Sequence, residues 1–564
     1  MVDGNGLGPG NIPVDGARHA AEISLSLGVP DVIARILVAR GITTPGEASV
    51  FLKPRLEHLS DPFDLPDMEK GVARFIDAVR KKQKICIWGD YDADGISSIA
   101  LVYNFLKNLG ITPDVHIPTR KEGYGLHKEG IEELHGRGID LLVSLDCGSS
   151  NIEEIAHARE LGIDTIVIDH HEIGSEIPPA AAVINPKRKD SLFPTRDLAA
   201  CGVAFFFLMG LRRVLDRKTM MPTRINLKKE LDLVTIGTVG DMVPLTGDNR
   251  VLVRHGIDVM NQAPRAWLRS MLGKNVISKG LVNEFSLGFI IIPRINAAGR
   301  VSRPDPSFDF LVSVDDATAL TCLAELQKAN TRRQTLERDI HEQIVRDISR
   351  NGLAGKKAIV VFDEKWSSHA GVLGIVAQKL TERFGKPAIV MTKVNGIWKG
   401  SGRGGDGMDL FETICSLSPL LLKYGGHKYA CGISVAEDNV GLFAEAFERS
   451  VEGMIIPRKR PVHIDTVAGF DELTVEAMDL IEELGPFGIG NPRPNLVFEA
   501  AGIYAASSGR TKIIDHNNRT WYGFYPAKEP IKTDGYARLI ASPTVRTEMG
   551  ERFVNLSIKE ILES

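Results

Sequence analysis

The chain has 564 residues, too many for a single hydrophobic core, so its length predicts three or four domains. Hydrophobic residues make up 43% and charged residues 25%, which is ordinary for a globular protein and argues against disordered, fibrous and membrane-embedded classes. The net charge of −4 provides no overall attraction to nucleic acid, so DNA binding would depend on local basic groups or on bound cations.

The N-terminal region is predicted to be a tail followed by helices. Residues 1–16 are rich in glycine and contain no apolar signal core, which predicts a loose tail on a cytoplasmic protein. Apolar residues recur at helical spacing over 23–59 and again over 61–81. We therefore assign residues 1–82 to an N-terminal tail and helical extension.

From residue 84 onward, short β-rich runs alternate with helical patterns, which predicts a parallel α/β sheet. The longest uncharged apolar run, residues 201–211, has about half the length of a membrane span and predicts a buried helix. This first α/β domain is expected to extend over residues 83–304. Its expected strands cover residues 85–88, 115–117, 141–145 and 165–168.

Three further regions complete a multi-domain α/β fold. Residues 305–352 are expected to be a connecting helical segment, because 306–350 contain no glycine. A second α/β domain is predicted over 353–454, with strands near 358–362 and 387–391 and a glycine-rich stretch, GSGRGGDG, from Gly400. Short β-like segments predict a small C-terminal β-barrel of the OB-fold type over 455–564. The six cysteines include no CxxC pair and predict reduced thiols.

An acidic cluster follows the first expected strand. In the segment GDYDADG, Asp90, Asp92 and Asp94 crowd a strand-to-helix turn, where like charges raise one another's pKa and favour a bound cation. The segment satisfies part of an EF-hand calcium loop, but Leu101 stands where that loop needs Glu, and a strand precedes it. A solvated acidic loop or a helix cap is the simpler alternative for the cluster taken alone.

Further acidic and histidine side chains follow other expected elements. Asp146 ends the strand at 141–145, Asp169-His170-His171 follows the strand at 165–168, and Asp241 follows 233–240. Ligands bind beyond the carboxyl ends of parallel strands, so these groups should meet. Carboxylates with an imidazole suit Mn²⁺ or Mg²⁺, and two such ions promote displacement at phosphorus. The sequence therefore predicts phosphodiester or phosphoanhydride hydrolysis.

The four motifs just described, DYDADG, the Asp146 strand, DHH at 169–171 and GTVGDMVPL at 237–245, resemble those of the DHH phosphoesterases. The resemblance runs from about Leu25 to the C-terminus, and it is greatest to the branch of that family that contains single-strand-specific 5′→3′ DNA exonucleases. The segments that carry it are IPTRKEGYGL (117–126), PRINAAGR (293–300), GVLGIVA (371–377), GSGRGG, GGHKYACG (425–432) and LGPFGIGNPRP (484–494).

The resemblance implies two divalent ions, Mn²⁺ or Mg²⁺, with Asp146 as the bridging ligand and Asp90 as a weaker candidate. The other implied ligands are Asp92, Asp94, His170 and Asp241. His171 would face the scissile phosphate, and Arg300, with Arg294 and Asn296, would stabilise its charge. The planar fork of arginine suits phosphate, although an ordinary salt bridge is the alternative for these arginines.

The second α/β domain resembles the DHH-associated domain. In GSGRGG, Ser401 and Arg403 match positions that bind a 5′-terminal phosphate, helped by Arg120, and His427 would complete the cleft. A turn at a domain edge is the alternative for this stretch. In the expected barrel, the candidates for stacking on bases are Trp521 and Tyr522, with Phe524 and the basic residues Arg510, Lys512 and Arg519 nearby. Packing in the core is the alternative for these aromatic residues.

By this resemblance the chain would be an exodeoxyribonuclease that releases 5′-mononucleotides from single-stranded DNA in recombination and repair. It would act as a monomer, together with a single-strand-binding protein and a RecQ-type helicase. Two other functions remain open. One is a DHH enzyme that acts on very short RNA, cyclic dinucleotides or pyrophosphate, and the other is a non-catalytic replication or scaffold protein.

Overall fold

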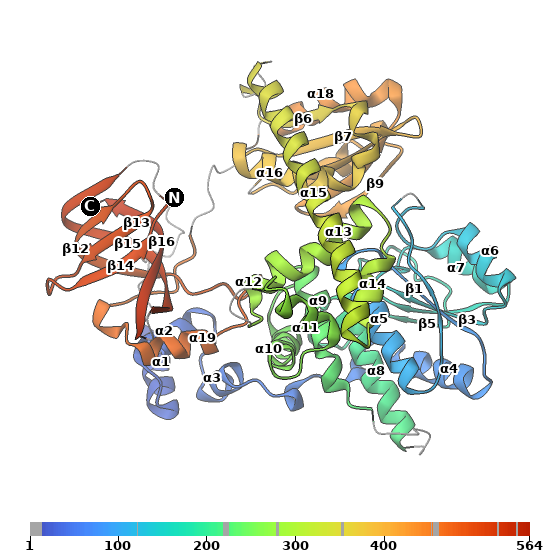
Figure 1. The fold of residues 1–564 in the computed structure, drawn as a ribbon, viewed down its shortest axis with the longest axis horizontal. Coiled ribbons are helices and arrows are strands. Elements are labelled where there is room, and N and C mark those ends of the chain that lie inside the picture. The colour runs from blue at the N-terminus through green and yellow to red at the C-terminus, as the bar shows by residue number, and fades with distance from the viewer. Residues whose placement is uncertain are drawn as a thin grey trace.

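The structure is a computed structural model in which N-terminal helices, two α/β domains and a C-terminal β domain follow one another (Figure 1). It describes residues 14–120, 122–217, 225–277, 281–350, 355–405, 407–452, 454, 462–526, 530–548 and 551–563. Most of the predicted tail, residues 1–13, lies outside these ranges, and the first helix begins at Val14. Among the described residues, no helix combines the length and the apolar character that a membrane span requires.

The first three helices pack on the C-terminal domain. They are α1 (Val14–Leu27), α2 (Asp31–Ala39) and α3 (Pro45–Leu52). Ile36 and Leu37 share one hydrophobic core with Phe470 and Leu496. Arg40 reinforces this contact through its Nε atom, which lies 2.9 Å from Oδ1 of the buried Asp465.

The first sheet has five parallel strands in the order β2-β1-β3-β4-β5. Four of them match the predicted strands within a residue at each end, and the short β5 was not predicted. The strands are β1 (Ile85–Gly89), β2 (Asp114–His116), β3 (Leu141–Leu145), β4 (Asp164–Ile168) and β5 (Ala182–Ile184). All five residues of β1 and of β3 are buried, as the apolar runs of a sheet covered on both faces require.

Helices cover both faces of this sheet. Ile87 of β1 belongs to the core that includes α5, α8 and α9, whereas its neighbour Trp88 belongs to the core that includes α6 and α7. The apolar run at 201–211 lies in the buried part of α8, as predicted. The helices of this domain up to Gly240 are α4 (Met68–Arg80), α5 (Ala93–Asn108), α6 (Lys128–Gly136), α7 (Ile152–Glu160), α8 (Ala200–Arg217) and α9 (Leu231–Gly240).

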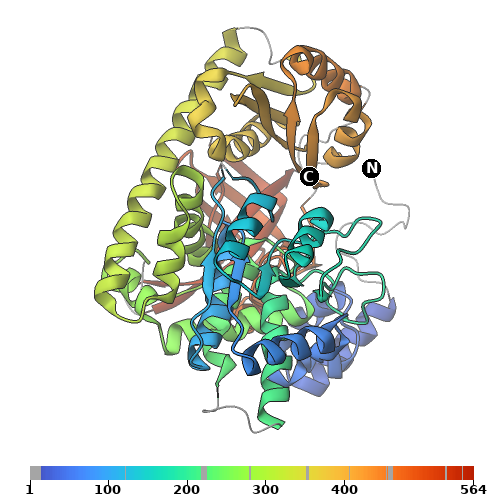
Figure 2. The ribbon, with the colours of Figure 1, turned by 90° about the vertical axis from the view of Figure 1, so that its right-hand side faces the viewer.

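The rest of the first domain is helical and leads into the connector. Its helices are α10 (Gly247–Gln262), α11 (Ala266–Gly273), α12 (Glu284–Ser286) and α13 (Ile292–Val301). The connector consists of two helices, α14 (Asp305–Val312) and the long α15 (Asp316–Arg350), because Asp315 starts a new helix by accepting a hydrogen bond from the Thr318 amide. Figure 2 shows α15 running beside the first domain and reaching the second.

The second α/β domain contains a five-stranded sheet in the order β6-β7-β8-β10-β9. The stretch from Gly400 to Arg403 forms the end of strand β8, so the first half of GSGRGGDG is not a turn. The strands are β6 (Ile359–Phe362), β7 (Ala388–Val394), β8 (Ile397–Arg403), β9 (Lys423–His427) and β10 (Ala430–Val435). The helices are α16 (Leu373–Phe384), α17 (Leu410–Ser416) and α18 (Val440–Glu452).

The C-terminal domain is a β structure with one helix, α19 (Val475–Glu483). Its strands are β11 (Thr466–Val467), β12 (Leu496–Ala505), β13 (Arg510–Ile514), β14 (Thr520–Phe524), β15 (Ile531–Glu548) and β16 (Glu551–Glu563). Pairing runs from β12 through β13, β14, β16 and β15, and β15 pairs again with β12.

Candidate metal centre

Buried and partly buried carboxylates and histidines gather at the carboxyl edge of the first sheet. They follow β1, β3 and β4 or end α9, so segments that are far apart in the sequence meet at one edge. Three sets of these groups have ligand atoms that all lie within 4.8 Å of one another. The sets are Asp90, Asp92 and Asp146; Asp94, His170 and Asp241; and Asp146, Asp169, His170 and His171.

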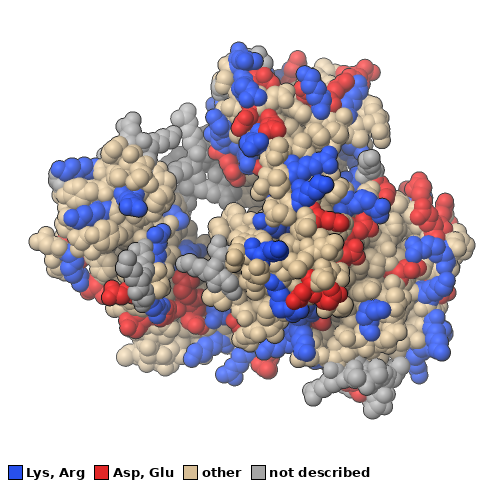
Figure 3. All heavy atoms as spheres, viewed as in Figure 1, with Lys and Arg blue, Asp and Glu red and all other residues tan. Residues whose placement is uncertain are grey.

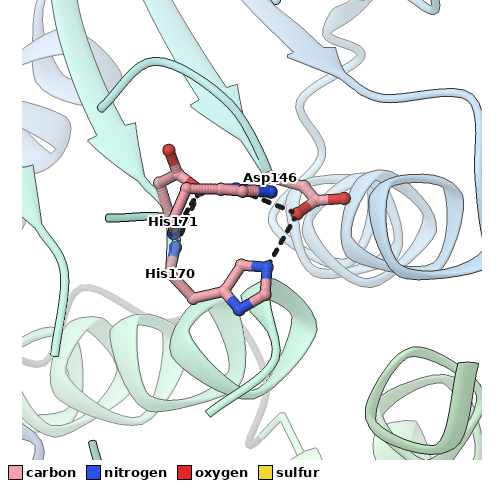
Figure 4. Close-up of side chains that lie close together, drawn as sticks. Asp146, His170 and His171 are labelled. Carbon is pink, nitrogen blue, oxygen red and sulfur yellow. Dashed lines mark hydrogen bonds and ion pairs between the residues drawn. The ribbon is translucent and has the colours of Figure 1, made fainter. Parts of the chain in front are cut away.

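His170 lies among the carboxylates. Its Nε2 atom is 3.3 Å from Oδ1 of Asp146 and 3.9 Å from Oδ2 of Asp94, and its Nδ1 atom is 3.6 Å from Oδ2 of Asp241. Figure 4 shows both His170 and His171 directed toward Asp146. Asp146 therefore lies between the Asp90–Asp92 pair and the group around His170, which is the position expected for a ligand shared by two ions.

The backbone around these ligands is built for close approach. Asp92 caps α5 by accepting hydrogen bonds from the amides of Asp94 and Gly95. A Cβ atom on Gly95 would lie 2.5 Å from the carbonyl oxygen of Asp90, so only glycine permits this turn. Asp146 has a φ of 60°, a left-handed conformation that Asp adopts more easily than most residues.

Burial and mutual repulsion shift the pKa of these groups. Burial, together with the charge of Asp92, raises the pKa of Asp90 to about 8 and that of Asp241 to about 7. Burial raises the pKa of Asp146 well above its ordinary value and lowers the pKa of His170 to about 3. Since buried carboxylates remain charged only beside a counter-charge, the cluster favours a cation.

The donor atoms also fit a divalent metal. Asp90 Oδ1, Asp146 Oδ1 and His170 Nε2 are buried and make no hydrogen bond within the described residues. A metal ion would satisfy these atoms, and a set of carboxylates with one neutral imidazole suits Mn²⁺ or Mg²⁺. Asp94 differs, because its two oxygens already accept hydrogen bonds of 2.7 and 2.9 Å from the amides of Ala200 and Cys201.

His171 is held by two residues to which the sequence analysis assigned no role. Its Nδ1 atom lies 2.8 Å from Oδ1 of Asp169. Although burial alone would lower it, the hydrogen bond and charge of Asp169 raise the pKa of His171 to about 9. Tyr124 lies 3.2 Å from the His171 ring and donates to the Asp146 carbonyl. Asp169 and Tyr124 belong to the DHH and GYG motifs, so both motifs marked the region. The sequence position of a residue beside a ligand does not reveal whether its side chain orients that ligand.

Arginines lie where the two α/β domains meet. Arg300 donates to the carbonyl of Gly371 at 3.2 Å, and burial, with the nearby charge of Arg120, lowers its pKa to about 10. Arg120 itself donates to the carbonyl of Gly299 at 3.1 Å. The charge of Arg403 also lowers the pKa of Arg300, so the guanidinium groups of Arg120, Arg300 and Arg403 lie in one region.

The second domain contributes Ser401, Arg403 and His427 to this junction. A Cβ atom on Gly374, in the first turn of α16, would lie 3.1 Å from Nη2 of Arg403 and 3.5 Å from Oγ of Ser401. Both side chains therefore lie at the N-terminus of a helix, where amide groups favour anions. The His427 ring stacks on His171 with centroids 6.2 Å apart, which connects β9 to the carboxylate edge.

The remaining candidates separate into different environments. Asn296 accepts a hydrogen bond of 2.7 Å from the Ala93 amide and so supports the metal loop. Arg294 instead bonds Gln327 of α15 at 2.9 Å. Trp521 packs against Phe470 and donates to Asp515, whereas Tyr522 is exposed, because neighbours in a strand point to opposite faces.

Known families match the two α/β domains. Residues 84–238 match the DHH family, N-terminal domain, and residues 355–453 match the DHHA1 domain. The chain is 33% identical over 488 residues to "Single-stranded-DNA-specific exonuclease RecJ" of Escherichia coli, covering 83% of each protein. It is 35% identical over 480 residues to the protein of the same name in Bacillus subtilis, covering 84% of this chain but only 59% of that relative.

Solved structures agree with these matches. RecJ of Thermus thermophilus in complex with Mn²⁺ superposes with a TM-score of 0.82 at 26% identity, covering 98% of this chain and 79% of that one. An exonuclease RecJ bound to manganese gives a TM-score of 0.58 at 32% identity, covering 71% of this chain and 98% of that one. With its paired DHH and DHHA1 domains, the chain belongs to the RecJ family.

Proposed function

We propose that this chain is a single-stranded-DNA-specific exonuclease that hydrolyses phosphodiester bonds with two divalent ions, Mn²⁺ or Mg²⁺. The observation that carries the proposal is the position of Asp146 between two groups of ligand atoms, of which Asp90 Oδ1, Asp146 Oδ1 and His170 Nε2 are buried without a hydrogen bond within the described residues. The names of the curated relatives support the activity, and the manganese-bound relatives support the ions.

Asp90, Asp92 and Asp146 are the candidate ligands of one ion, and Asp146 with His170, Asp241 and Asp94 those of the other. Ions of this kind supply an activated water and stabilise the attacking and leaving oxygens of an in-line displacement. Against the effect of burial, the hydrogen bond and charge of Asp169 favour the protonated ring of His171, whose Nδ1 atom lies 2.8 Å from Asp169 Oδ1. Its Nε2 atom lies 3.3 Å from the hydroxyl of Tyr124 and would bind an oxygen of the scissile phosphate beside that hydroxyl, with Arg300 supplying further positive charge.

The direction of cleavage follows from the arginine junction. Ser401 and Arg403, at the N-terminus of α16, together with Arg120, form a site suited to a terminal phosphate dianion. A 5′-phosphate bound there puts the first internucleotide bond nearest the carboxylates, so each cut releases one 5′-mononucleotide. His427 lies beside His171, with ring centroids 6.2 Å apart, and would contact the same strand end. We propose 5′→3′ polarity because Ser401 and Arg403 match the positions that bind a 5′-terminal phosphate in the family that the chain resembles.

The C-terminal domain is proposed to be an OB-fold barrel that binds the unpaired strand. The return of strand pairing from β15 to β12 supports a closed sheet. Tyr522 has 59% of its surface exposed and is the better candidate for stacking on bases, since Trp521 faces the core. Figure 3 shows Lys and Arg side chains on the visible face of this domain, which suits a phosphate backbone.

The biological setting is also a proposal. A role in recombination and repair is proposed from the family resemblance, as are the expected partners, a single-strand-binding protein and a RecQ-type helicase. A monomeric state and a cytoplasmic location stay predictions of the sequence.

Digestion of 5′-labelled substrates by the purified chain tests the function. Single-stranded DNA, the matching duplex and a dinucleotide are incubated with Mn²⁺, Mg²⁺ or a chelator. We expect labelled mononucleotide from the single strand only, and no product with the chelator. Equal cleavage of the duplex would contradict the proposal, and cleavage of the dinucleotide alone would favour an enzyme of very short substrates.

A further inference from the structure

A second group of metal-ligating side chains lies away from the carboxylate centre. His116 ends β2, His127 precedes α6, and Glu122 lies in the segment between them. One ligand atom from each lies within 4.8 Å of the other two. His116 Nε2 is 3.8 Å from Oε2 of Glu122, which is too long for a hydrogen bond.

The two imidazoles are held in place but are not satisfied. Trp88 stacks on His116 with centroids 3.8 Å apart and meets His127 edge-on at 5.0 Å. The Nε2 atoms of both histidines are shielded from solvent, and neither makes a hydrogen bond within the described part of the chain. Shielded polar atoms normally have partners, so two orphaned imidazole nitrogens beside one carboxylate point to a cation as their common partner.

The donor set differs from that of the carboxylate centre. Two imidazoles and one carboxylate are a zinc donor set that leaves a fourth position for water. Zn–N bonds of about 2.0–2.1 Å put tetrahedral ligands roughly 3.3 Å apart, so the three ligand atoms, which lie within 4.8 Å of one another, need to approach by at most about 1.5 Å. Burial also lowers the pKa of His116, which keeps its ring neutral as a metal ligand requires.

Two of the three side chains already make hydrogen bonds. Glu122 accepts from the amide and the hydroxyl of Thr119 at 3.1 and 3.2 Å, and a carboxylate oxygen has a second lone pair left for a metal. His127 caps α6 by accepting the Gly130 amide at Nδ1, at 3.0 Å. Metal binding through Nε2 would put a proton on Nδ1 and remove this cap. A helix cap contributes about 1 kcal/mol, so its loss would weaken zinc binding by only about fivefold.

We propose that His116, Glu122 and His127 form a zinc site that fixes the segment between β2 and α6. The same segment carries Arg120 and Tyr124, which contact Gly299 and Asp146. An ion bound at one side of this segment would therefore hold both side chains toward the carboxylate edge. The inference rests on the His-Glu-His cluster alone and does not depend on the proposed nuclease function.

Zinc binding to the full chain tests the inference. Zn²⁺ is titrated by equilibrium dialysis in excess Mg²⁺, and Co²⁺ is added in a parallel experiment as a spectroscopic probe. Because Zn²⁺ can also enter the carboxylate centre, the measured quantity is the difference between the wild type and two variants. The variants are His116→Gln and His127→Asn; the second keeps a side chain that caps helices well.

We expect each variant to bind one fewer tight Zn²⁺ and to lose the intense visible absorption of four-coordinate Co²⁺. The matched control is His157→Gln. His157 has an exposed fraction of 25% and lies 3.3 Å from Glu132, but belongs to no group of three ligating side chains within the described residues. The His157→Gln variant should bind as many tight Zn²⁺ ions as the wild type does.

A Mn²⁺-dependent rise in melting temperature shows that each variant is folded with an intact carboxylate centre. Equal Zn²⁺ stoichiometry in the wild type and both variants would overturn the inference. It would also be overturned if the wild type with Co²⁺ showed only the weak absorption of a six-coordinate ion.

Discussion

The guanidinium of Arg300 donates a hydrogen bond to the carbonyl of Gly371, so the first α/β domain contacts the second next to the carboxylate edge. The approach is also close between the backbones, since a Cβ atom on Gly371 would lie 2.3 Å from the carbonyl oxygen of Arg300. Glycine at 371 therefore sets the distance between the two halves of the proposed active site.

Gly371→Ala should separate these halves. We expect nuclease activity to fall by about 10²-fold, because misplacement of reacting groups by about 1 Å has an effect of that size. Steady-state digestion of single-stranded DNA measures it. The control is Gly441→Ala in α18, where a Cβ atom would meet nothing within 4 Å. Equal activity of the two variants would contradict the role of this contact.

Asp146→Asn tests the shared ligand, and Asn preserves the shape of the side chain and tolerates the left-handed φ of 60°. We expect activity to fall by at least about 10³-fold.

At one hundred times Kd, Mn²⁺ should add about 2.7 kcal/mol to the free energy of unfolding of the wild type and much less to that of the variant. In chelator the variant should be the more stable of the two, because a buried like charge is removed. Thermal unfolding with and without Mn²⁺ measures both effects, and an unchanged Mn²⁺ response in the variant would exclude Asp146 as a ligand.

Arg403→Ala should weaken recognition of the DNA end. The ratio of kcat/KM for 5′-phosphorylated over 5′-hydroxyl single strands should fall by roughly tenfold or more, because a charged hydrogen bond to phosphate is lost. The Mn²⁺-dependent rise in melting temperature should stay the same. The control is Arg383→Ala, because Arg383 is exposed and lies in the last turn of α16, the helix whose N-terminus lies beside Arg403. An unchanged ratio in Arg403→Ala would remove the end-binding site from the proposal.

Tyr522 and Trp521 should respond differently to truncation. Tyr522→Ala should weaken binding of single-stranded DNA by about 1–3 kcal/mol and leave stability nearly unchanged, because the ring is exposed. Trp521→Ala should lower the free energy of unfolding by roughly 3 kcal/mol, because its ring packs against Phe470. Fluorescence anisotropy and urea unfolding separate the two effects. The reverse pattern would show that the two faces of β14 have been assigned the wrong way round.

Asp232 gives the fold a pH dependence away from the metal centre. Burial, partly offset by the charge of Arg265, raises the pKa of Asp232 to about 6, whereas an unfolded Asp titrates near about 3.9. As the pH falls from about 6 to 4, the native state binds a proton before the unfolded chain does, so this carboxyl contributes more stability at the lower pH.

Asp232→Asn cannot take up this proton. Between pH 7 and 4, the wild type should gain about 2 kcal/mol of unfolding free energy relative to the variant. Urea unfolding of both proteins across this range, in chelator, measures the difference. Parallel stability curves would contradict the raised pKa.

Local patterns in the sequence were sufficient for the catalytic sheet. β1, β3 and β4 were predicted closely because fully buried strands read as short apolar runs, and the acidic residues follow them directly. The three residues of β5 are too few to give such a pattern. The break between α14 and α15 depends on one capping side chain, Asp315, inside a sequence that favours helix throughout.

Contacts between distant segments were not accessible in the same way. Arg40 and Asp465 belong to elements separated by most of the chain, and nothing local to either one indicates that the N-terminal helices share a core with the C-terminal domain. Nothing local to Asp94 indicates its partners either, because its oxygens accept hydrogen bonds from amides at the start of α8.

The sequence by itself determined which ligand types this chain carries, at which strand ends, and to which family it belongs, because strand periodicity, turn chemistry and motif spacing are local properties. Only the tertiary structure decided that Asp169 and Tyr124 hold His171, that the amides at the start of α8 bind Asp94, and that Trp521 faces the core. Distances, burial and pKa shifts arise from packing between distant segments, and that packing depends on the whole fold.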